Sequence, residues 1–294
     1  MKDLLTRLSV MPGVTLNPPA DSEQIEAAER KFGAPLPAEL REFYSLCDGL
    51  VLDEGNDVPS LQQSQEYFQQ IPGSLLSSLI VVLDEHESNP ICIFHSGPLR
   101  GYVAHVYHDD DSHVRWRSFR SLLEHVLTQL SGDGEMWVRD LRAELDHPKR
   151  TEQDIEAGRA MIQFASSLEL HGAESPLAYT FAFDLLGDEQ VAEISAFLEH
   201  EDMFVARAAR DRLVQLPSDG AKAALKKHQD ELKRLVDRCA EVFRRAGREA
   251  TVVNDCDFRV GPNQMGLNWE AINTQKHRPD FDQWLLNIGR NTSA

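Results

Sequence analysis

The sequence lacks the features of a secreted or membrane-spanning protein. Its N-terminus has no basic start followed by an apolar run, and about 18 consecutive apolar residues, enough to span a bilayer, occur nowhere. The four cysteines are far apart and form no CxxC pair, which argues against a zinc ribbon or a small disulfide scaffold. We therefore expect a soluble cytoplasmic protein with reduced, mostly buried thiols and no membrane partner.

The common catalytic signatures are also missing. No GxxxxGK phosphate loop, GxGxxG turn, GxSxG elbow or HExxH helix occurs. The best metal candidates are His105, His108 and His113, which lie close to the Asp109–Asp111 run. In a strand, His105 and His108 would point to opposite faces, so one ion could take both only if the chain bends after Tyr107. We predict no catalytic residues, no metal and no cofactor, hence a protein that is not an enzyme.

Basic residues are scarce in one span of the chain. The 294 residues carry a net charge of −18, and between Asp48 and Asp111 Arg100 stands alone against eleven acids, a net of −10. One interpretation is a solvated surface that keeps the protein soluble. The other is a negative face that repels nucleic acid and attracts basic proteins.

Two short amphipathic helices are predicted between residues 21 and 49. Asp21 is a suitable N-cap with Gln24 three residues later, and Gly33 offers a left-handed end to the first helix. The apolar residues of the second helix recur at helical spacing after Pro37 and stop at Gly49. The two helices therefore meet at a corner framed by prolines.

This stretch resembles the opening of the SUKH superfamily, which groups a fungal regulator of cell-wall synthesis with bacterial toxin-immunity proteins. The resemblance rests on Glu29, Leu36, Pro37, Glu39, Leu40, Phe43, Tyr44 and the Cys47-Asp48-Gly49 end. The family usually has Asn where Asp48 stands. The resemblance covers roughly residues 15 to 132 and leaves the rest of the chain without one. Its motifs are structural, so they indicate a fold more directly than an activity.

The pattern predicts an α+β domain followed by a helical domain. Short apolar segments separated by turn residues predict an antiparallel meander, at 80–83, 91–95, 102–107 and 114–116. Predicted helices at 61–68 and 118–130 flank this sheet. We place the boundary near residue 148, which gives a SUKH-like α+β domain at 1–148 and a helical domain at 149–294.

The second half is predicted to be helical with a mixed tail. Helices are expected at 152–168, 176–186, 189–198, 204–216 and 221–246, after a further one at 135–145. The pair ending at Pro217 resembles one HEAT-type unit. The 221–246 helix and its flank carry nine basic residues against four acids, either a solvated face or a nucleic-acid or partner contact. The tail is expected to contain a strand at 251–253 and a helix at 281–288.

The resemblance implies non-catalytic recognition, since bacterial members commonly neutralise a cognate toxin, often a nuclease, by binding it. We predict that an acidic face with aromatic anchors contacts a basic toxin domain and not nucleic acid directly. The predicted partner-binding residues are Asp53, Glu54, Asp57, Asp84, Glu85, Glu87, Tyr102, Tyr107, Asp109, Asp110, Asp111 and Trp116. The alternative is a scaffold or regulatory adaptor with two partner-binding domains. The sequence leaves the oligomeric state open.

Overall fold

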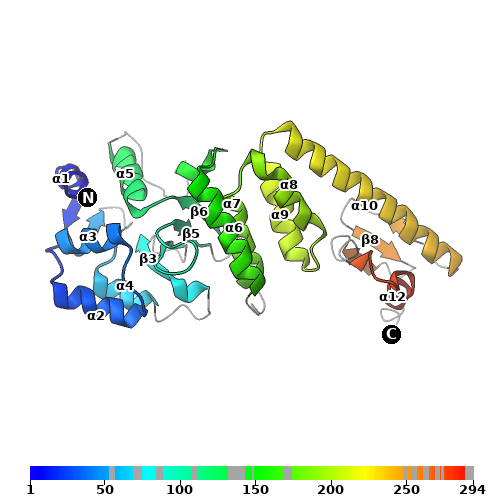
Figure 1. The fold of residues 1–294 in the computed structure, drawn as a ribbon, viewed down its shortest axis with the longest axis horizontal. Helices are drawn as coiled ribbons and strands as arrows, with labels where there is room; N and C mark the ends of the chain where they lie inside the picture. The colour runs from blue at the N-terminus through cyan, green and yellow to red at the C-terminus, as the bar shows by residue number, and fades with distance from the viewer. Residues whose placement is uncertain are drawn as a thin grey trace. The chain divides into compact units, whose positions relative to one another are not determined.

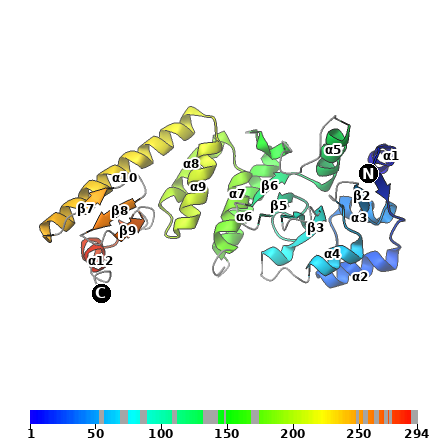
Figure 2. The ribbon, with the colours of Figure 1, turned by 180° about the vertical axis from the view of Figure 1, so that it is seen from behind.

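The structure is a computed structural model, drawn from opposite sides in Figures 1 and 2. It describes residues 1–52, 57–68, 75–83, 89–107, 112–131, 143–147, 149–167, 174–247, 250–252, 257–260, 265–268, 272 and 275–288. The chain forms two compact units, Met1–Leu186 and Gly187–Ala294. We call them unit 1 and unit 2 and describe each by itself.

Unit 1 contains helices and two antiparallel sheets. Its helices are α1 (Lys2–Leu8), α2 (Ser22–Phe32), α3 (Ala38–Leu46), α4 (Leu61–Phe68), α5 (Phe119–Leu130), α6 (Glu152–Ser167) and α7 (Glu174–Asp184), with short 3-10 turns η1 (Leu76–Ser78) and η3 (Glu144–Asp146). Strands β1 (Val14–Leu16) and β2 (Leu50–Leu52) form a two-stranded ribbon. Strands β3 (Leu79–Leu83), β4 (Ile91–Phe94), β5 (Val103–His105) and β6 (His113–Trp116) form a four-stranded meander in chain order.

The corner between α2 and α3 forms as its sequence predicts. Asp21 Oδ1 accepts from the Gln24 N–H at 2.8 Å, and the Asp21 N–H donates to Gln24 Oε1 at 2.8 Å, which completes a capping box. Gly33 ends α2 in the left-handed region, with φ of 76°. Pro37 is the N-cap of α3. The sequence therefore specifies both ends of α2 and the start of α3 locally.

One face of the four-stranded sheet packs against the helices that precede and follow it in the chain. Its core combines α2, α3, α4 and α5 with alternate strand residues such as Ile80, Ile93 and Val103. Phe43 of α3 meets Phe119 of α5 edge to face, with ring centroids 5.0 Å apart. This side of the domain is the expected α+β arrangement, which the structure confirms.

The opposite face of the same sheet is buried as well. Phe94 and Val114 are 1% and 3% exposed, although neither belongs to the core described above. The helices that cover this face are α6 and α7, which lie beside β5 and β6 in Figure 1. Phe94 packs edge to face on Phe181 of α7, with centroids 5.3 Å apart. The meander is therefore the middle layer of unit 1.

Because of this second helical layer, the compact units divide the chain at a later residue than the boundary proposed from the sequence. The sequence placed the boundary near residue 148, before α6, whereas the compact units divide between Leu186 and Gly187. The physical reason is that α6 and α7 bury a sheet face that would otherwise be exposed. Gly158 lets the two helices approach closely, since a Cβ there would lie 2.9 Å from the Ala182 carbonyl oxygen. We propose residues 1–186 as the first domain.

Unit 2 contains helices and a small sheet. Its helical segments are η4 (Asp188–Gln190), α8 (Val191–Ser195), η5 (Ala196–Glu199), α9 (Met203–Gln215), α10 (Asp219–Arg245) and α12 (Phe281–Ile288). The α8–η5 segment packs on α9, as predicted for a HEAT-type pair, and α10 packs on both. Phe243 of α10 forms a separate core with Phe281 and Leu285 of α12. Strands β7 (Ala250–Val252), β8 (Asp257–Val260) and β9 (Met265–Asn268) form an antiparallel sheet.

The predicted elements and the described ones agree closely. Most boundaries fall within two or three residues of expectation, and α4 and α12 match their predicted ranges. The sequence did not predict α1, β1, β2, β8 or β9. Most of the helix expected at 135–145 lies outside the described residues. In the described part of the chain, no helix has both the length and the apolar content needed to cross a bilayer.

Candidate partner interface

The structure describes four of the twelve predicted partner-binding residues. These four are Asp57, Tyr102, Tyr107 and Trp116. The other eight lie outside the described residues, namely Asp53, Glu54, Asp84, Glu85, Glu87, Asp109, Asp110 and Asp111. For these eight the structure gives only the described strand ends between which their segments run.

Two of the three predicted aromatic anchors are core residues. Trp116 is fully buried in the core between the sheet and helices α2, α3, α4 and α5. Tyr102 is 5% exposed, and its hydroxyl donates to Asp154 Oδ1 of α6 at 3.0 Å. Burial and the nearby Asp154 carboxylate raise the pKa of Tyr102. Neither ring offers surface to a partner, because α6 and α7 cover the face on which Tyr102 lies.

The strand ends beside two acidic segments lie side by side. Leu83, Ile91, His105 and His113 are successive partners across β3, β4, β5 and β6. Residues 84–88 follow β3, and residues 108–111 precede β6. The two segments that carry six of the predicted acidic residues therefore connect to strand ends on this side of the sheet. We call this region the acidic sheet end, with Asn89, His105, Tyr107, Ser112 and His113 as its described residues.

Tyr107 is the predicted anchor that keeps exposed surface. It is half-buried, and its ring lies on His105 with centroids 4.0 Å apart. Its backbone N–H donates to Ser112 Oγ at 2.9 Å, which ties the ends of β5 and β6 together. His105 is fully buried, and its Nε2 lies 3.2 Å from the Asn89 carbonyl oxygen. Burial lowers the pKa of His105 to about 4, so the ring under Tyr107 is neutral at pH 7.

Asp184, at the C-terminus of α7, fastens that helix to the acidic sheet end. Its Oδ2 accepts from the Val114 N–H at 2.8 Å, and its Oδ1 lies 3.0 Å from His113 Nδ1. The carboxylate is nearly buried, and it satisfies a donor on the open edge of β6. The sequence gave no sign of this contact, because 70 residues separate the two partners.

Asp57 lies elsewhere, next to the β1–β2 ribbon. Its Oδ1 accepts from the Leu52 N–H at 3.0 Å, and the following residue, Val58, pairs with Leu50. Asp57 is half-buried by this contact. The ribbon is a separate sheet from the meander. Asp57 therefore lies beside a different sheet from the acidic sheet end.

Several residues that carry the family resemblance hold helix ends. Glu29 Oε1 accepts from the Leu36 N–H and from Arg41 Nε, each at 3.1 Å. Glu39 Oε2 accepts from the Arg120 N–H at 3.0 Å, in the first turn of α5. Free N–H groups at a helix start need such acceptors. These two carboxylates therefore brace the corner between α2 and α3 and the start of α5.

The Asp48-Gly49 pair sets the turn that leads into β2. Asp48 Oδ1 accepts from the N–H of Leu61, the first residue of α4, at 2.7 Å. An Asn side chain has the same acceptor oxygen, so Asp48 can take the place of the usual family residue. Gly49 has φ of 92°, and a Cβ there would lie 2.8 Å from the Val58 carbonyl oxygen. Only glycine fits this position without a backbone shift.

Residues 19–125 match the SMI1 / KNR4 family (SUKH-1). The match confirms the resemblance for the N-terminal part of the chain, and it is consistent with a protein-binding role. No curated protein shows a significant match to the chain. The SUKH-1 match ends within α5, so α6 and α7 lie outside it although they cover its sheet.

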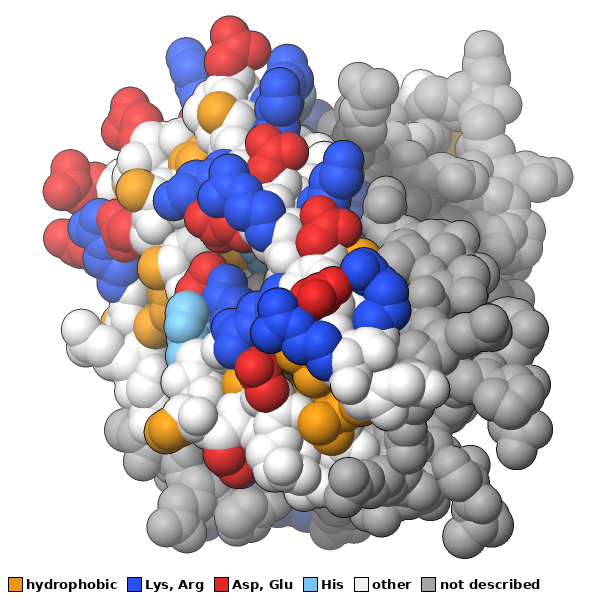
Figure 3. Space-filling model, turned by 90° about the vertical axis from the view of Figure 1, so that its right-hand side faces the viewer, with side chains coloured by type: hydrophobic (Ala, Val, Ile, Leu, Met, Phe, Trp, Pro, Cys, Tyr) orange, Lys and Arg blue, Asp and Glu red, His pale blue; other side chains and the backbone are white. Residues whose placement is uncertain are grey.

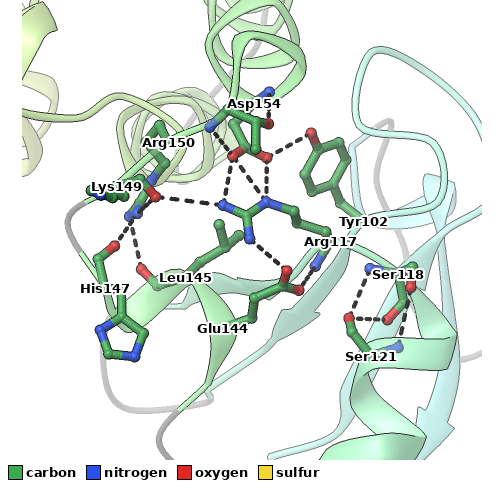
Figure 4. A network of polar contacts seen from close by, with 11 residues as sticks. Tyr102, Arg117, Ser118, Ser121, Glu144, Leu145, His147, Lys149, Arg150 and Asp154 are labelled. Atoms are coloured by element: carbon green, nitrogen blue, oxygen red, sulfur yellow. Dashed lines mark hydrogen bonds and ion pairs between the residues drawn. The ribbon is translucent and has the colours of Figure 1, made fainter.

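Arg117 joins the SUKH-1 sheet to this added helical layer (Figure 4). Its guanidinium makes a bidentate pair with Asp154 at 2.8 to 3.0 Å and also pairs with Glu144. Asp154 is fully buried and accepts from the Thr151 N–H at the start of α6. Burial opposes its charge, but the hydrogen bonds from Arg117 and Thr151 prevail and lower the pKa of Asp154.

Arg150 ties down the chain just before α6. Its guanidinium donates to the carbonyl oxygens of Leu145, at 2.8 Å, and of His147 (Figure 4). It also donates to the Asp184 carbonyl oxygen at 2.7 Å. The sequence interpreted residues 146–151 as an exposed break between domains. The contacts of Arg117 and Arg150 make this segment a braced joint within unit 1.

Nothing in the described residues forms a metal site or an activated thiol. No group of three His, Cys, Asp or Glu side chains there lies close enough to share an ion. Cys47, Cys92 and Cys239 are buried free thiols, and Cys256 lies outside the described residues. Burial raises the pKa of Cys47 to about 11 and that of Cys239 to about 12. Such thiols are protonated and poorly nucleophilic at pH 7.

Several basic residues of α10 pair with acids of unit 2. Glu241 binds Arg244 at 2.7 Å and Arg245 at 2.9 Å, and Arg238 binds Asp282 of α12 at 2.8 Å. The face shown in Figure 3 has Lys and Arg side chains interleaved with Asp and Glu. These contacts favour the interpretation of a solvated, locally paired helix face over a continuous basic surface for nucleic acid.

Three residues that join the layers of unit 1, namely Asp154, Asp184 and His113, differ in how far the sequence indicated them. Asp154 is the third helical residue after Thr151, a Thr-x-x-Asp spacing typical of a helix start. That spacing locates the cap of α6 but not its partner Arg117. Asp184 and His113 carry no local signal, because each is ordinary in its own segment. Contacts across different layers become visible only once the fold is known.

Proposed function

We propose that the chain is an immunity protein that neutralises a cognate bacterial toxin, with the acidic sheet end covering the toxin's basic active-site surface. A nuclease is the favoured class of toxin, since a phosphate-binding surface is strongly basic. Inhibition is by occlusion: the carboxylates attached to the sheet end take the place of substrate phosphates. No catalytic step by this chain is needed.

The observation that carries the proposal is the placement of charge. Unit 1 contains 14 Lys and Arg against 30 Asp and Glu, a net charge of −16, whereas unit 2 contains 16 against 18, a net of −2. The acid excess therefore belongs to the unit with the SUKH-1 match. Six of these acids are attached to one sheet end, where their fields add and steer a basic partner.

Charge alone cannot supply a tight complex. Nanomolar affinity needs about 12 kcal/mol, and exposed carboxylates mainly increase the association rate. A desolvated aromatic anchor supplies more. Tyr107 takes this role in the proposal, because Tyr102 and Trp116 lie in the core. Its ring is held in place from below by His105 and is partly exposed.

The test is the association rate with the toxin domain encoded by a neighbouring gene, at low and high salt. The variant is the triple substitution Asp109→Lys, Asp110→Lys and Asp111→Lys, which shifts the net charge by +6. We expect association at low salt to slow by about 10-fold or more, with a flatter salt dependence.

The matched control makes the same +6 shift in net charge on unit 2. Asp219, Asp230 and Asp237 are exposed on α10, and their replacement by Lys changes the net charge equally. The control should retain most of the association rate, because its charges lie far along the sequence from the sheet end. Equal slowing in both variants would reduce the effect to net charge, and no slowing in either would reject the acidic sheet end as the interface.

The alternative function is a scaffold or regulatory adaptor. The observation that favours it is the division into two compact units of different charge, which suits two different partners. The two functions differ in what happens to the bound protein. An immunity protein abolishes the activity of its toxin in a stoichiometric complex, whereas the partners of an adaptor stay active when bound.

A further inference from the structure

Helix α9 of unit 2 buries one face and leaves the opposite face open. Val205, Ala209 and Leu213 are buried against α8–η5 and α10. On the other face, Phe204 is 54% exposed and Val214 is 66% exposed. Among the unit 2 residues whose burial the structure describes, these are the two exposed large apolar side chains. Single exposed apolar side chains are common on protein surfaces, so a partner is inferred only from the way these two are arranged with their neighbours.

Two opposite charges lie between the apolar residues on the same stripe. Arg207 and Asp211 give the order Phe204, Arg207, Asp211, Val214, with spacings of three, four and three residues. At about 100° per residue these four positions fall within roughly 80° of the helix circumference. The Arg207 guanidinium lies 6.0 Å from the centre of the Phe204 ring, and Asp211 pairs with Arg210 at 3.2 Å. We call these four residues the α9 stripe.

The α9 stripe is complementary to itself when it is reversed. A twofold axis through the level of Ala209 places Phe204 of one copy against Val214 of the other. The same axis places Arg207 of one copy against Asp211 of the other. Each contact occurs twice, as in any isologous interface. Antiparallel helices that pack 8 to 10 Å apart bring such positions into contact.

We propose that α9 pairs antiparallel with α9 of a second copy of this chain, through the α9 stripe. The occupant follows from the pattern, because apolar meets apolar and cation meets anion only in the reversed register. The stripe extends over about 15 Å of helix, less than a large obligate interface. The dimer is therefore weak and concentration-dependent. This inference concerns unit 2 and is independent of the proposed function.

The test uses sedimentation of the full chain between about 2 and 300 µM, with charge reversals on the stripe. Arg207→Asp places two like charges opposite each other at both ends of the interface, and Asp211→Arg does the same with the other sign. Each single variant should weaken the dimer at least 10-fold. The double variant Arg207→Asp with Asp211→Arg should return the dissociation constant to within about 3-fold of the unmodified chain.

A mixture of the two single variants gives the sharpest comparison. In a mixed dimer, both charged contacts join Asp to Arg, so the mixture should form a heterodimer more tightly than either variant forms a homodimer. Changes within one chain cannot produce this result, because both proteins are the same before and after mixing. Arg244→Asp, on the exposed side of α10, is the control and should leave association unchanged.

Other outcomes would overturn the proposal. They are an unmodified chain that stays monomeric up to 300 µM, single variants that associate as well as the unmodified chain, or a mixture that remains monomeric. Circular dichroism of each variant verifies that unit 2 keeps its helices. The variants Phe204→Ser and Val214→Ser should each weaken the dimer, because each removes one partner from both of its Phe204–Val214 contacts.

Discussion

Units 1 and 2 stabilise their charged groups in different environments. In unit 1 the Asp154 carboxylate is fully buried and its partner Arg117 is 27% exposed, and together they join the sheet to α6. In unit 2 the pair between Arg238 and Asp282 is about half exposed on both sides. A buried pair is costly to break because one charge is left without its partner, whereas an exposed pair contributes little. Breaking the Arg–Asp pair of unit 1 should therefore destabilise that unit substantially, and breaking the Arg–Asp pair of unit 2 should have little effect.

The two units also differ in net charge. Unit 1 has a net charge of −16 and encloses its main sheet between two helical layers, so its acids lie on connections and helix faces. Unit 2 has a net charge of −2, and several of its Lys and Arg side chains pair with nearby acids. Electrostatic steering of a basic partner is therefore proposed for unit 1. The balanced charge of unit 2 suits contacts between surfaces of balanced charge.

The largest effect is expected from cutting the chain before α6. A fragment of residues 1–148 loses Asp154, Phe181 and Asp184, so the outer face of the sheet and the edge of β6 become exposed. We expect this fragment to aggregate or to lack a cooperative unfolding transition, whereas residues 1–186 should unfold cooperatively. Thermal unfolding followed by circular dichroism compares the two. A stable 1–148 fragment would restore the boundary that the sequence indicated.

The substitution Asp154→Ala should have the next largest effect. It leaves Arg117 without its bidentate partner and the Tyr102 hydroxyl without an acceptor, so we expect a loss of about 3 to 5 kcal/mol in the free energy of unfolding of unit 1. The matched change in unit 2 is Asp282→Ala, which should cost about 0 to 1 kcal/mol. Urea unfolding of the full chain measures both. Equal losses would remove the contrast between the units.

The sequence predicted most elements of the fold because their signals are local. The Asp21 cap, the left-handed Gly33 and the apolar spacing of α5 are each readable within a few residues. β1 and β2 were missed because they pair with each other across α2 and α3, so no hairpin turn beside either strand marks them. The tail strands β8 and β9 contain Asp257, Gly266 and Asn268, residue types that are depleted in strands.

The burial of the sheet on both faces was available in the sequence but was not used. Residues 79–83 read LIVVL and residues 91–94 read ICIF, apolar at every position. A strand with one solvent-exposed face alternates apolar and polar residues, whereas a strand covered on both faces is apolar at successive positions. That pattern places Tyr102 and Phe94 in the interior and predicts a further helical layer. The acidic sheet end, in contrast, depends on strand register, which single segments do not reveal.

The pH dependence of unit 1 should report the buried His105. Its pKa is depressed to about 4, so the unfolded chain binds a proton near its ordinary pKa of about 6.5 while the folded chain does not. Stability is therefore full above pH 6.5 and falls as the pH drops toward 4, by about 3 kcal/mol in total. His105→Gln, which keeps an N–H donor, should flatten this slope in denaturant unfolding at pH 7 to 4.5. The exposed His147→Gln is the control, and an equal slope in both variants would exclude His105 as the origin.

Two glycine substitutions should differ in sign between the units, with the smallest effects. In unit 1, a Cβ at Gly158 meets the Ala182 carbonyl oxygen at 2.9 Å, and this backbone atom cannot move without separating α6 from α7. Gly158→Ala should therefore cost about 1 to 3 kcal/mol. In unit 2, a Cβ at Gly220, in the first turn of α10, meets nothing closer than 3.8 Å. Gly220→Ala should stabilise by about 0.4 to 1 kcal/mol, because it reduces the freedom of the unfolded chain without strain. Urea unfolding of both variants measures the pair, and a stabilising Gly158→Ala would show that α6 and α7 are less tightly packed than the structure places them.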